Sequence, residues 1–235
     1  MSSTIGCLGK VVVVIPAYNE AAVVGDVISA IPARIDSRIV IPILVDDGST
    51  DETAAIAERL GATVIRHLAN LGVGSATRTG MNVAKDLDAD IVVTIDADGQ
   101  HDPREIERLV RCLIDEKHDV VIGSRLLEPA GMPVSRFAAN LLLNALTFLV
   151  YRKVVSDSQS GFKAFSRRAL HSIQLTAVGY DVCSEIIGEI VRQELSYKSL
   201  PVRPVYTKYS RSKGQHFLNG MNLILQLLSR MLRRV

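Results

Sequence analysis

Two aspartates, Asp96 and Asp98, stand one residue apart directly after the apolar run at residues 91–95. That run consists of β-branched residues, which is typical of a parallel strand buried on both faces. In an open parallel sheet, ligands bind beyond the carboxyl ends of the strands, so we expect both carboxylates where chemistry would occur. A pair of hard oxygen donors suits Mg²⁺ or Mn²⁺, the cations that commonly hold substrate phosphates.

A purely structural role for this pair is the alternative. Asp98 could cap the helix expected to begin near Pro103, or Asp98 and Gly99 could form only a turn. Asp102, directly before Pro103, is a better placed N-cap residue. The earlier pair is then left without a structural role, and the sequence favours the metal site.

Acidic residues also follow two earlier strand candidates, at Glu20 and at Asp46 with Asp47. There they could accept hydrogen bonds from the base or ribose of a nucleoside. Residues 47–51 are equally good turn and helix-capping chemistry, so both interpretations stay open for either site alone. Three acidic strand ends in one sheet favour a binding edge, because clustered carboxylates are costly unless they are paired or metal-bound.

Phosphate-binding candidates lie elsewhere along the chain. The glycine-spaced loop at residues 70–76 opens a helix, and its amides could face a phosphate, although a flexible connection explains the loop equally well. Arg125 ends another strand, and Arg136 and Asn140 are spaced i, i+4 on one helical face. Arginine suits a bidentate grip on phosphate, but a single arginine is usually a solvated surface charge.

The last third of the chain carries weaker signals. The apolar helix at 136–151 is expected to pack in the core, with a hydrocarbon-facing groove as the alternative. The cationic loop at 206–215 is either a mobile phosphate clamp or a solvated loop. From His216 onward the chain is amphipathic with a basic end, so it could dock on the domain or lie on an anionic membrane surface.

Strands and helices must alternate to position these residues. The expected strands are 11–15, 39–45, 62–66, 91–95, 119–123, 163–165 and 198–204, and the expected helices are 20–31, 51–60, 74–87, 103–116, 136–151 and 181–194. Such alternation predicts an α/β fold with a mostly parallel, doubly wound sheet. We expect one domain over residues 1–215, followed by a C-terminal amphipathic helix over 216–235.

Composition narrows the class of protein. The net charge of +2 is too small to indicate nucleic-acid binding, and charged and hydrophobic shares of 22% and 48% are ordinary for a globular domain. Three scattered cysteines fit a reduced cytosolic protein, and no cysteine or histidine cluster has zinc spacing. We expect no secretory signal and no membrane span, since the charge-free stretch at 137–151 is shorter than the roughly 20 residues a span needs.

Taken in order, these segments resemble the family 2 glycosyltransferases, and within them the dolichyl-phosphate mannose synthase-like, polyprenyl-phosphate glycosyltransferase group. The matching motifs are Val-Ile-Pro-Ala-Tyr-Asn-Glu at 14–20, Val-Asp-Asp-Gly-Ser-Thr-Asp at 45–51, Asn-Leu-Gly-Val-Gly at 70–74, Asp-Ala-Asp-Gly-Gln at 96–100, Gly-Ser-Arg at 123–125 and Ser-Gly-Phe at 160–162, with Asp157 and Glu185. Two motifs depart from the family pattern. Val73 stands where the family has lysine, and a late basic motif survives only as Ser212 and Lys213.

The resemblance implies a single-domain GT-A (Rossmann-like) fold and a role for each matching residue. The donor nucleotide sugar is expected at Pro16, Tyr18, Glu20, Asp46, Asp47, Asp96 and Gln100, and Mg²⁺ or Mn²⁺ at Asp96, Asp98 and Gln100. The acceptor phosphate is expected at Arg125, Arg136, Asn140, Ser160, Arg211 and Lys213, and the catalytic residues are expected to be Asp98, Arg125, Asp157 and Glu185.

The implied reaction is the inverting transfer of a hexose from a UDP- or GDP-sugar to a dolichyl or undecaprenyl phosphate. An acceptor hydroxyl on a glycan or small molecule is the alternative, with Asp157 or Glu185 as the base. A nucleotidyltransferase and a non-catalytic nucleotide-binding module are less favoured, because the first strand lacks a glycine-rich basic loop and Asp96 and Asp98 are intact. We expect a cytoplasmic protein, with peripheral contact to the membrane left open.

Overall fold

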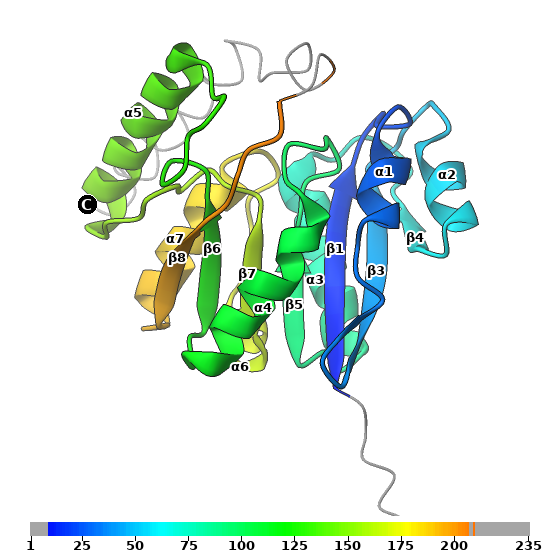
Figure 1. Ribbon diagram of the computed structural model, residues 1–235, viewed down its shortest axis with the longest axis horizontal. Helices are drawn as coiled ribbons and strands as arrows, with labels where there is room; N and C mark the ends of the chain where they lie inside the picture. The colour runs from blue at the N-terminus through cyan, green and yellow to red at the C-terminus, as the bar shows by residue number, and fades with distance from the viewer. Residues whose placement is uncertain (1–8, 207–208, 210–235) are drawn as a thin grey trace, which may run out of the picture.

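The computed structural model describes residues 9–206 and Tyr209. Its centre is an eight-stranded sheet in the order β2-β3-β1-β5-β7-β6-β8, with β4 also paired to β3 (Figure 1). The strands are β1 (Lys10–Ala17), β2 (Arg34–Ile35), β3 (Arg38–Asp46), β4 (Thr63–Arg66), β5 (Ile91–Thr94), β6 (Val120–Ser124), β7 (Lys163–Ser166) and β8 (Tyr197–Pro201). The helices are α1 (Val24–Ser29), α2 (Thr53–Arg59), α3 (Val73–Asp86), α4 (Ile106–Asp115), α5 (Val134–Tyr151), α6 (Arg167–Ser172) and α7 (Val182–Arg192).

The predicted mostly parallel sheet is confirmed. Strands β1, β3, β4, β5, β6 and β8 run in one direction, whereas β2 pairs antiparallel with β3, and β7 runs antiparallel between β5 and β6. The carboxyl ends of the parallel strands therefore meet at one edge. Because β7 is reversed, its first residue, Lys163, lies at that same edge, opposite Thr94 of β5 and Ile122 of β6.

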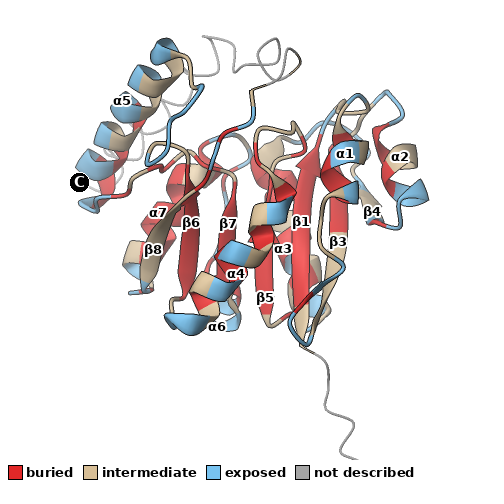
Figure 2. Cartoon of the chain, in the orientation of Figure 1, coloured by how far each residue is buried: buried red, intermediate tan, exposed pale blue. Residues whose placement is uncertain are grey.

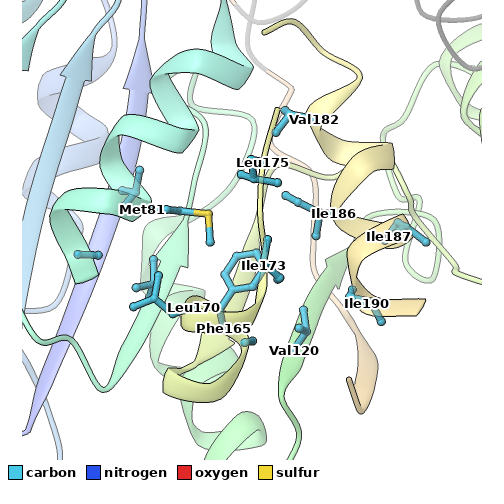
Figure 3. Close-up of a cluster of buried hydrophobic side chains, with 14 of the residues drawn as sticks. Met81, Val120, Phe165, Leu170, Ile173, Leu175, Val182, Ile186, Ile187 and Ile190 are labelled. Carbon is cyan, nitrogen blue, oxygen red and sulfur yellow. The ribbon is translucent and has the colours of Figure 1, made fainter. Parts of the chain in front are cut away.

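Helices cover both faces of the sheet, and the strands explain why. Along β1, Val11 and Val13 pack into one buried cluster while Val12 and Val14 pack into another. Helices α1, α2 and α4 contribute to the first cluster, and α3, α6 and α7 to the second, which Figure 3 shows in part. The central strands are accordingly buried throughout, as their continuous apolar runs predict (Figure 2).

Some element boundaries differ from the prediction. Helix α1 begins only at Val24, because residues 21–23 form turns, and β8 ends at Pro201, opposite Ser124, where its partner β6 also ends.

Helix α6 was not expected, and its first turn is stabilised by the Ser166 hydroxyl, which accepts a hydrogen bond from the Ala169 amide at 3.2 Å. The amphipathic segment 216–235 and the residues of the cationic loop other than Tyr206 and Tyr209 lie outside the described residues.

Among the helices, α5 differs most from its prediction, which was a helix packed in the core. It is 18 residues long with a mean hydropathy of 1.3, and only 22% of it is buried. Leu143, Thr147, Val150 and Tyr151 face the domain, while its outer side is exposed (Figure 2). By length and composition alone α5 could cross a membrane, so the expectation of no membrane span is not confirmed; a helix of this kind is weak evidence for a span.

Candidate active site

A cavity of about 1010 Å³ opens at the edge where the parallel strands end. Ten of the residues expected in the site line it: Pro16, Tyr18, Glu20, Asp47, Asp96, Asp98, Gln100, Arg125, Arg136 and Asn140. These residues follow β1, β3, β5 and β6 or lie on the first turns of α5. Because the carboxyl ends of the parallel strands meet at one edge, residues that are more than 100 positions apart in the sequence lie together in this cavity.

Asp96 and Asp98 lie together in this cavity. The pKa of Asp96 is raised to about 6, mainly by burial and secondly by the neighbouring Asp98 carboxylate. Burial also raises the pKa of Asp98. The Asp96 carboxylate packs directly on Gly161, where a Cβ would come within 2.2 Å of Oδ2. Asp102 caps the following helical turn, accepting from the Arg104 amide at 3.0 Å, which leaves Asp96 and Asp98 free of that role, as expected.

This pair fits a divalent cation. Two adjacent buried carboxylates repel each other, and a cation between them would remove that cost. No group of three or more His, Cys, Asp or Glu side chains gathers in the described part of the chain. A cation here would therefore draw its remaining ligands from water and substrate phosphate, as Mg²⁺ commonly does.

Gln100 forms two hydrogen bonds to the carboxylate of Asp98. Its amide Nε2 donates to Asp98 Oδ2 at 2.6 Å, and its backbone N–H donates to Asp98 Oδ1 at 2.9 Å. The Gln100 carbonyl in turn accepts from the Val205 amide at 2.9 Å. In this structure Gln100 orients Asp98, which differs from the direct metal ligation expected of it.

Arg125 is fixed in the cavity by hydrogen bonds to Asp157. Its Nε donates to Asp157 Oδ2 at 2.8 Å and its Nη2 donates to Asp157 Oδ1 at 3.0 Å. Burial would raise the pKa of Asp157, but the Arg125 guanidinium outweighs it and holds that pKa below its ordinary value. Asp157 is 0% exposed and does not line the cavity, so it positions Arg125 and is not available as the base that a hydroxyl acceptor would need.

Asn144 of α5 fixes the loop that carries Asp157. Its Nδ2 donates to the Ser156 carbonyl at 2.7 Å, and its Oδ1 accepts from the Ser158 amide at 2.8 Å. The two peptides that flank Asp157 are thus held by one side chain. Arg136, Asn140 and Asn144 follow one another at intervals of four and form a polar stripe along α5, continuous with the cavity.

The segment after β8 closes one side of the cavity. The Tyr206 ring lies 5.6 Å from the Arg136 guanidinium carbon, a cation–π contact. Tyr209 Oη donates to Glu20 Oε2 at 2.8 Å. This segment therefore contacts both the donor side and the acceptor side expected from the sequence.

Asp47 lines the cavity but also makes strong contacts within the protein. Its carboxylate accepts from the Leu71 amide at 2.9 Å and from the Gly72 amide at 2.7 Å, and it pairs with His67 Nδ1 at 2.7 Å. Those amides belong to the glycine-spaced loop, so the idea that they face a phosphate is wrong for these two. Gly72 is required there, since a Cβ would meet the Val178 carbonyl oxygen at 2.3 Å.

Three other expected residues do not line the cavity. Asp46 Oδ1 accepts from the Ser49 amide at 3.0 Å and so stabilises the turn that was the alternative interpretation. Glu185 accepts from the Thr176 amide at 3.0 Å and the Ala177 amide at 2.8 Å, which anchors that segment to α7. Ser160 is fully buried behind Gly161. Arg211 and Lys213 lie outside the described residues.

The structure adds cavity residues that the sequence analysis missed. They include Lys163, Tyr180 and Cys183, whereas Tyr206, which also lines the cavity, is the first residue of the loop at 206–215 already considered as a phosphate clamp. The charge of Lys163 at the start of an otherwise apolar strand is the signal in the sequence that indicates it, but only a reversed strand brings its first residue to this edge. Tyr206 follows β8 by five residues, beyond the expected strand.

Comparison with known proteins gives one family. Residues 12–174 match the model of the family described as glycosyl transferase family 2. A UDP-N-acetylglucosamine–dolichyl-phosphate N-acetylglucosaminyltransferase of Methanococcus voltae is 36% identical, over 92% of this chain and 93% of that protein. A polyprenol monophosphomannose synthase of Mycolicibacterium smegmatis is 29% identical, over 91% of this chain and 83% of that protein.

A solved structure supports the same fold. Glucosyl-3-phosphoglycerate synthase from Mycobacterium tuberculosis, in complex with Mn²⁺ and UDP-glucose, has a TM-score of 0.72 and 27% identity. The match covers 97% of this chain and 79% of that one. The predicted GT-A fold is thereby confirmed.

Proposed function

The chain belongs to glycosyl transferase family 2, and on that premise we propose that it transfers a hexose from a UDP- or GDP-sugar to the phosphate of a polyprenyl lipid. As a family member it is a nucleotide-sugar-dependent glycosyltransferase. The dolichyl or polyprenyl phosphate named for two relatives supports the class of acceptor. The UDP-glucose bound to the similar structure supports the class of donor.

One observation carries the proposal. A single cavity contains the carboxylates of Asp96 and Asp98 at β5 and the guanidinium of Arg125 at β6. The carboxylates suit the metal-bound diphosphate of a donor, and the arginine suits an acceptor phosphate. A phosphate monoester has a second pKa of ~6 and is already a nucleophile near neutral pH, so this acceptor needs no general base.

Each residue then has a task in the displacement. Asp96 and Asp98 would hold Mg²⁺ or Mn²⁺, which when bound supplies Lewis-acid stabilisation of the departing nucleoside diphosphate. Arg125, fixed by Asp157, and Arg136 would bind the acceptor phosphate and reduce its repulsion from the donor diphosphate. Attack opposite the leaving group would invert the anomeric carbon. Pro16, Tyr18, Glu20 and Asp47 are proposed to contact the nucleoside.

Helix α5 supports a lipid acceptor. Its polar stripe faces the cavity, while Leu141, Phe148 and Leu149 are exposed on the outside at 47%, 39% and 46%. Exposed apolar side chains gathered on one helix mark an interaction surface. We propose that this face lies on the cytoplasmic side of the membrane, so that the lipid chain leaves the cavity along α5. The division into a catalytic domain over 1–215 and a C-terminal helix, with Arg211 and Lys213 as phosphate contacts, remains part of the proposal.

A hydroxyl acceptor is the second candidate. It is favoured by the similar structure of a synthase that forms glucosyl-3-phosphoglycerate. Such a reaction needs a base, and the described carboxylates that line the cavity are Glu20, Asp47, Asp96 and Asp98, all on the donor side.

A transfer screen tests the proposal. The purified chain is incubated with UDP- and GDP-sugars, Mn²⁺ and a short-chain polyprenyl phosphate, and products are identified by mass spectrometry. We expect a polyprenyl phosphoryl-hexose and no product from the corresponding polyprenol, which lacks the phosphate. Product formed from hydroxyl acceptors alone, with none from the lipid phosphate, would establish the second candidate instead.

A further inference from the structure

Lys163 is a fully buried lysine at the edge of the sheet where the parallel strands end. It is 0% exposed, begins β7, and pairs with Thr94 of β5 and Ile122 of β6. Burying an ammonium group is expensive unless it is paired or hydrogen-bonded. A lysine at such a position therefore needs a physical explanation, which neither the family match nor the sequence motifs provide.

The contacts that Lys163 makes within the protein do not explain why it is buried. Its ammonium donates to the Ser160 carbonyl, and in the described part of the chain it forms no ion pair with a carboxylate. An ammonium group has three donors, so one backbone carbonyl leaves most of its capacity unused. Lys163 is among the residues that line the cavity, so a substrate group bound there is the partner available to the remaining donors.

The other cations of the cavity are engaged differently. Among the described lining residues the cations are Arg125, Arg136 and Lys163. Arg125 is paired with Asp157 through its Nε and Nη2, and Arg136 lies against the Tyr206 ring. Lys163 is the cation of this set that is buried without a charged partner in the described structure.

Its location is between the two halves of the site. Lys163 bonds the carbonyl of Ser160, and the next residue, Gly161, carries the Asp96 carboxylate against its Cα. Burial raises the pKa of Asp96, and Arg125 and Lys163 are the cations that oppose this rise. The ammonium group is thus within electrostatic reach of Asp96 and of Asp157, the partner of Arg125.

We propose that Lys163 is a further phosphate-binding residue of this active site, whose ammonium group donates hydrogen bonds to a phosphoryl oxygen of the substrate between Asp96 and Arg125. The inference rests on the proposed function, because it needs a phosphate in this cavity. That oxygen belongs either to the donor diphosphate or to the acceptor phosphate. A simpler alternative is that Lys163 only neutralises Asp96 in the folded protein.

Stability and binding separate these two roles. The variants are Lys163→Met, which keeps the length and removes the charge; Lys163→Arg, which keeps the charge; and Lys198→Met, a control at an exposed lysine paired with Glu116 on the surface. Melting temperature, the Kd of UDP or GDP with Mn²⁺ by calorimetry, and KM and kcat for the lipid phosphate are measured for each.

We expect Lys163→Met to melt no lower than the wild type, because replacing a buried charge by an apolar side chain of similar size is often neutral or stabilising. Loss of a charge-assisted hydrogen bond should weaken phosphate binding by about 10- to 100-fold. A weaker Kd for the nucleotide would assign Lys163 to the donor diphosphate, and a higher acceptor KM with unchanged Kd would assign it to the acceptor. Lys163→Arg should retain part of the binding, and Lys198→Met should match the wild type.

Two outcomes would overturn the inference. One is a Lys163→Met variant that binds nucleotide and uses acceptor with wild-type constants. The other is a Lys163→Met variant that combines a lower melting temperature with an unchanged nucleotide Kd and an unchanged acceptor KM, which would assign the lysine to neutralising Asp96. Failure of the wild type to use a lipid phosphate would refute the proposed acceptor alone, since nucleotide binding still tests Lys163.

Discussion

At the scale of single residues, the acidic side chains divide into two groups by what they contact. Asp96 and Asp98 lie in the cavity with raised pKa values, which is typical of functional carboxylates. Asp46, Asp157 and Glu185 are more deeply buried and accept hydrogen bonds from backbone amides or from Arg125. Sequence motifs detect both groups alike, because they identify conserved-looking types and spacings but not hydrogen-bond partners.

Removal of Asp98, a proposed metal ligand, is the first residue-scale prediction. Asp98→Ala should reduce transfer by roughly 100- to 1000-fold or more, because electrostatic stabilisation of the leaving diphosphate is lost. The melting temperature should stay close to that of the wild type, since burial already makes the charged carboxylate unfavourable. Chelation of divalent cations should reproduce the loss in the wild type. Normal turnover of Asp98→Ala would exclude the metal role.

The Arg125–Asp157 pair gives a second residue-scale prediction. Asp157→Leu leaves a buried guanidinium without its partner and should lower the free energy of unfolding by about 3–5 kcal/mol in a denaturant titration. The double variant Arg125→Met with Asp157→Leu should recover most of that stability while remaining inactive with the lipid phosphate. Recovery of both stability and acceptor use in the double variant would contradict the role of Arg125.

At the scale of elements, β7 and α5 do most to shape the cavity. The reversed strand β7 brings the start of a strand, Lys163, to the edge where its neighbours end. Helix α5 presents Arg136 and Asn140 to the cavity and holds the Asp157 loop through Asn144. Alternation of apolar runs predicted the existence of both elements, but the direction of a short strand cannot be predicted from its own four residues.

The exposed side of α5 carries the element-scale prediction. Replacing Leu141, Phe148 and Leu149 together by serine should reduce binding to lipid vesicles, and turnover of long-chain acceptor, by roughly tenfold or more, because each buried apolar side chain contributes about 1.5–3 kcal/mol. Turnover of a short-chain acceptor in solution should be unchanged. A matched control replaces the exposed Leu60 and Leu68, at 44% and 106%, by serine. Equal loss in both variants would argue against α5 as the membrane face.

At the scale of the whole molecule, the fold class was predictable because one physical rule governs it. Strands buried on both faces must be continuously apolar, and residues 11–15 and 91–95 carry that pattern without ambiguity. The rule that ligands bind beyond the carboxyl ends of parallel strands predicted where Asp96 and Asp98 lie, and both line the cavity at that edge. It could not reveal that Asp47 would be bound by the amides of Leu71 and Gly72, since that depends on how a loop folds back over the sheet.

Strand β7 also separates two groups of cavity residues that come from different parts of the chain. The side chains proposed to bind the nucleotide come from residues before position 101, and those proposed to bind the acceptor come from residues after position 122; β7 lies between β5 and β6 in the sheet. Changes in one segment can therefore alter which lipid or hydroxyl compound is glycosylated without disturbing which nucleotide is recognised. In a scaffold divided in this way, one side of the cavity can change its specificity while the other side is kept.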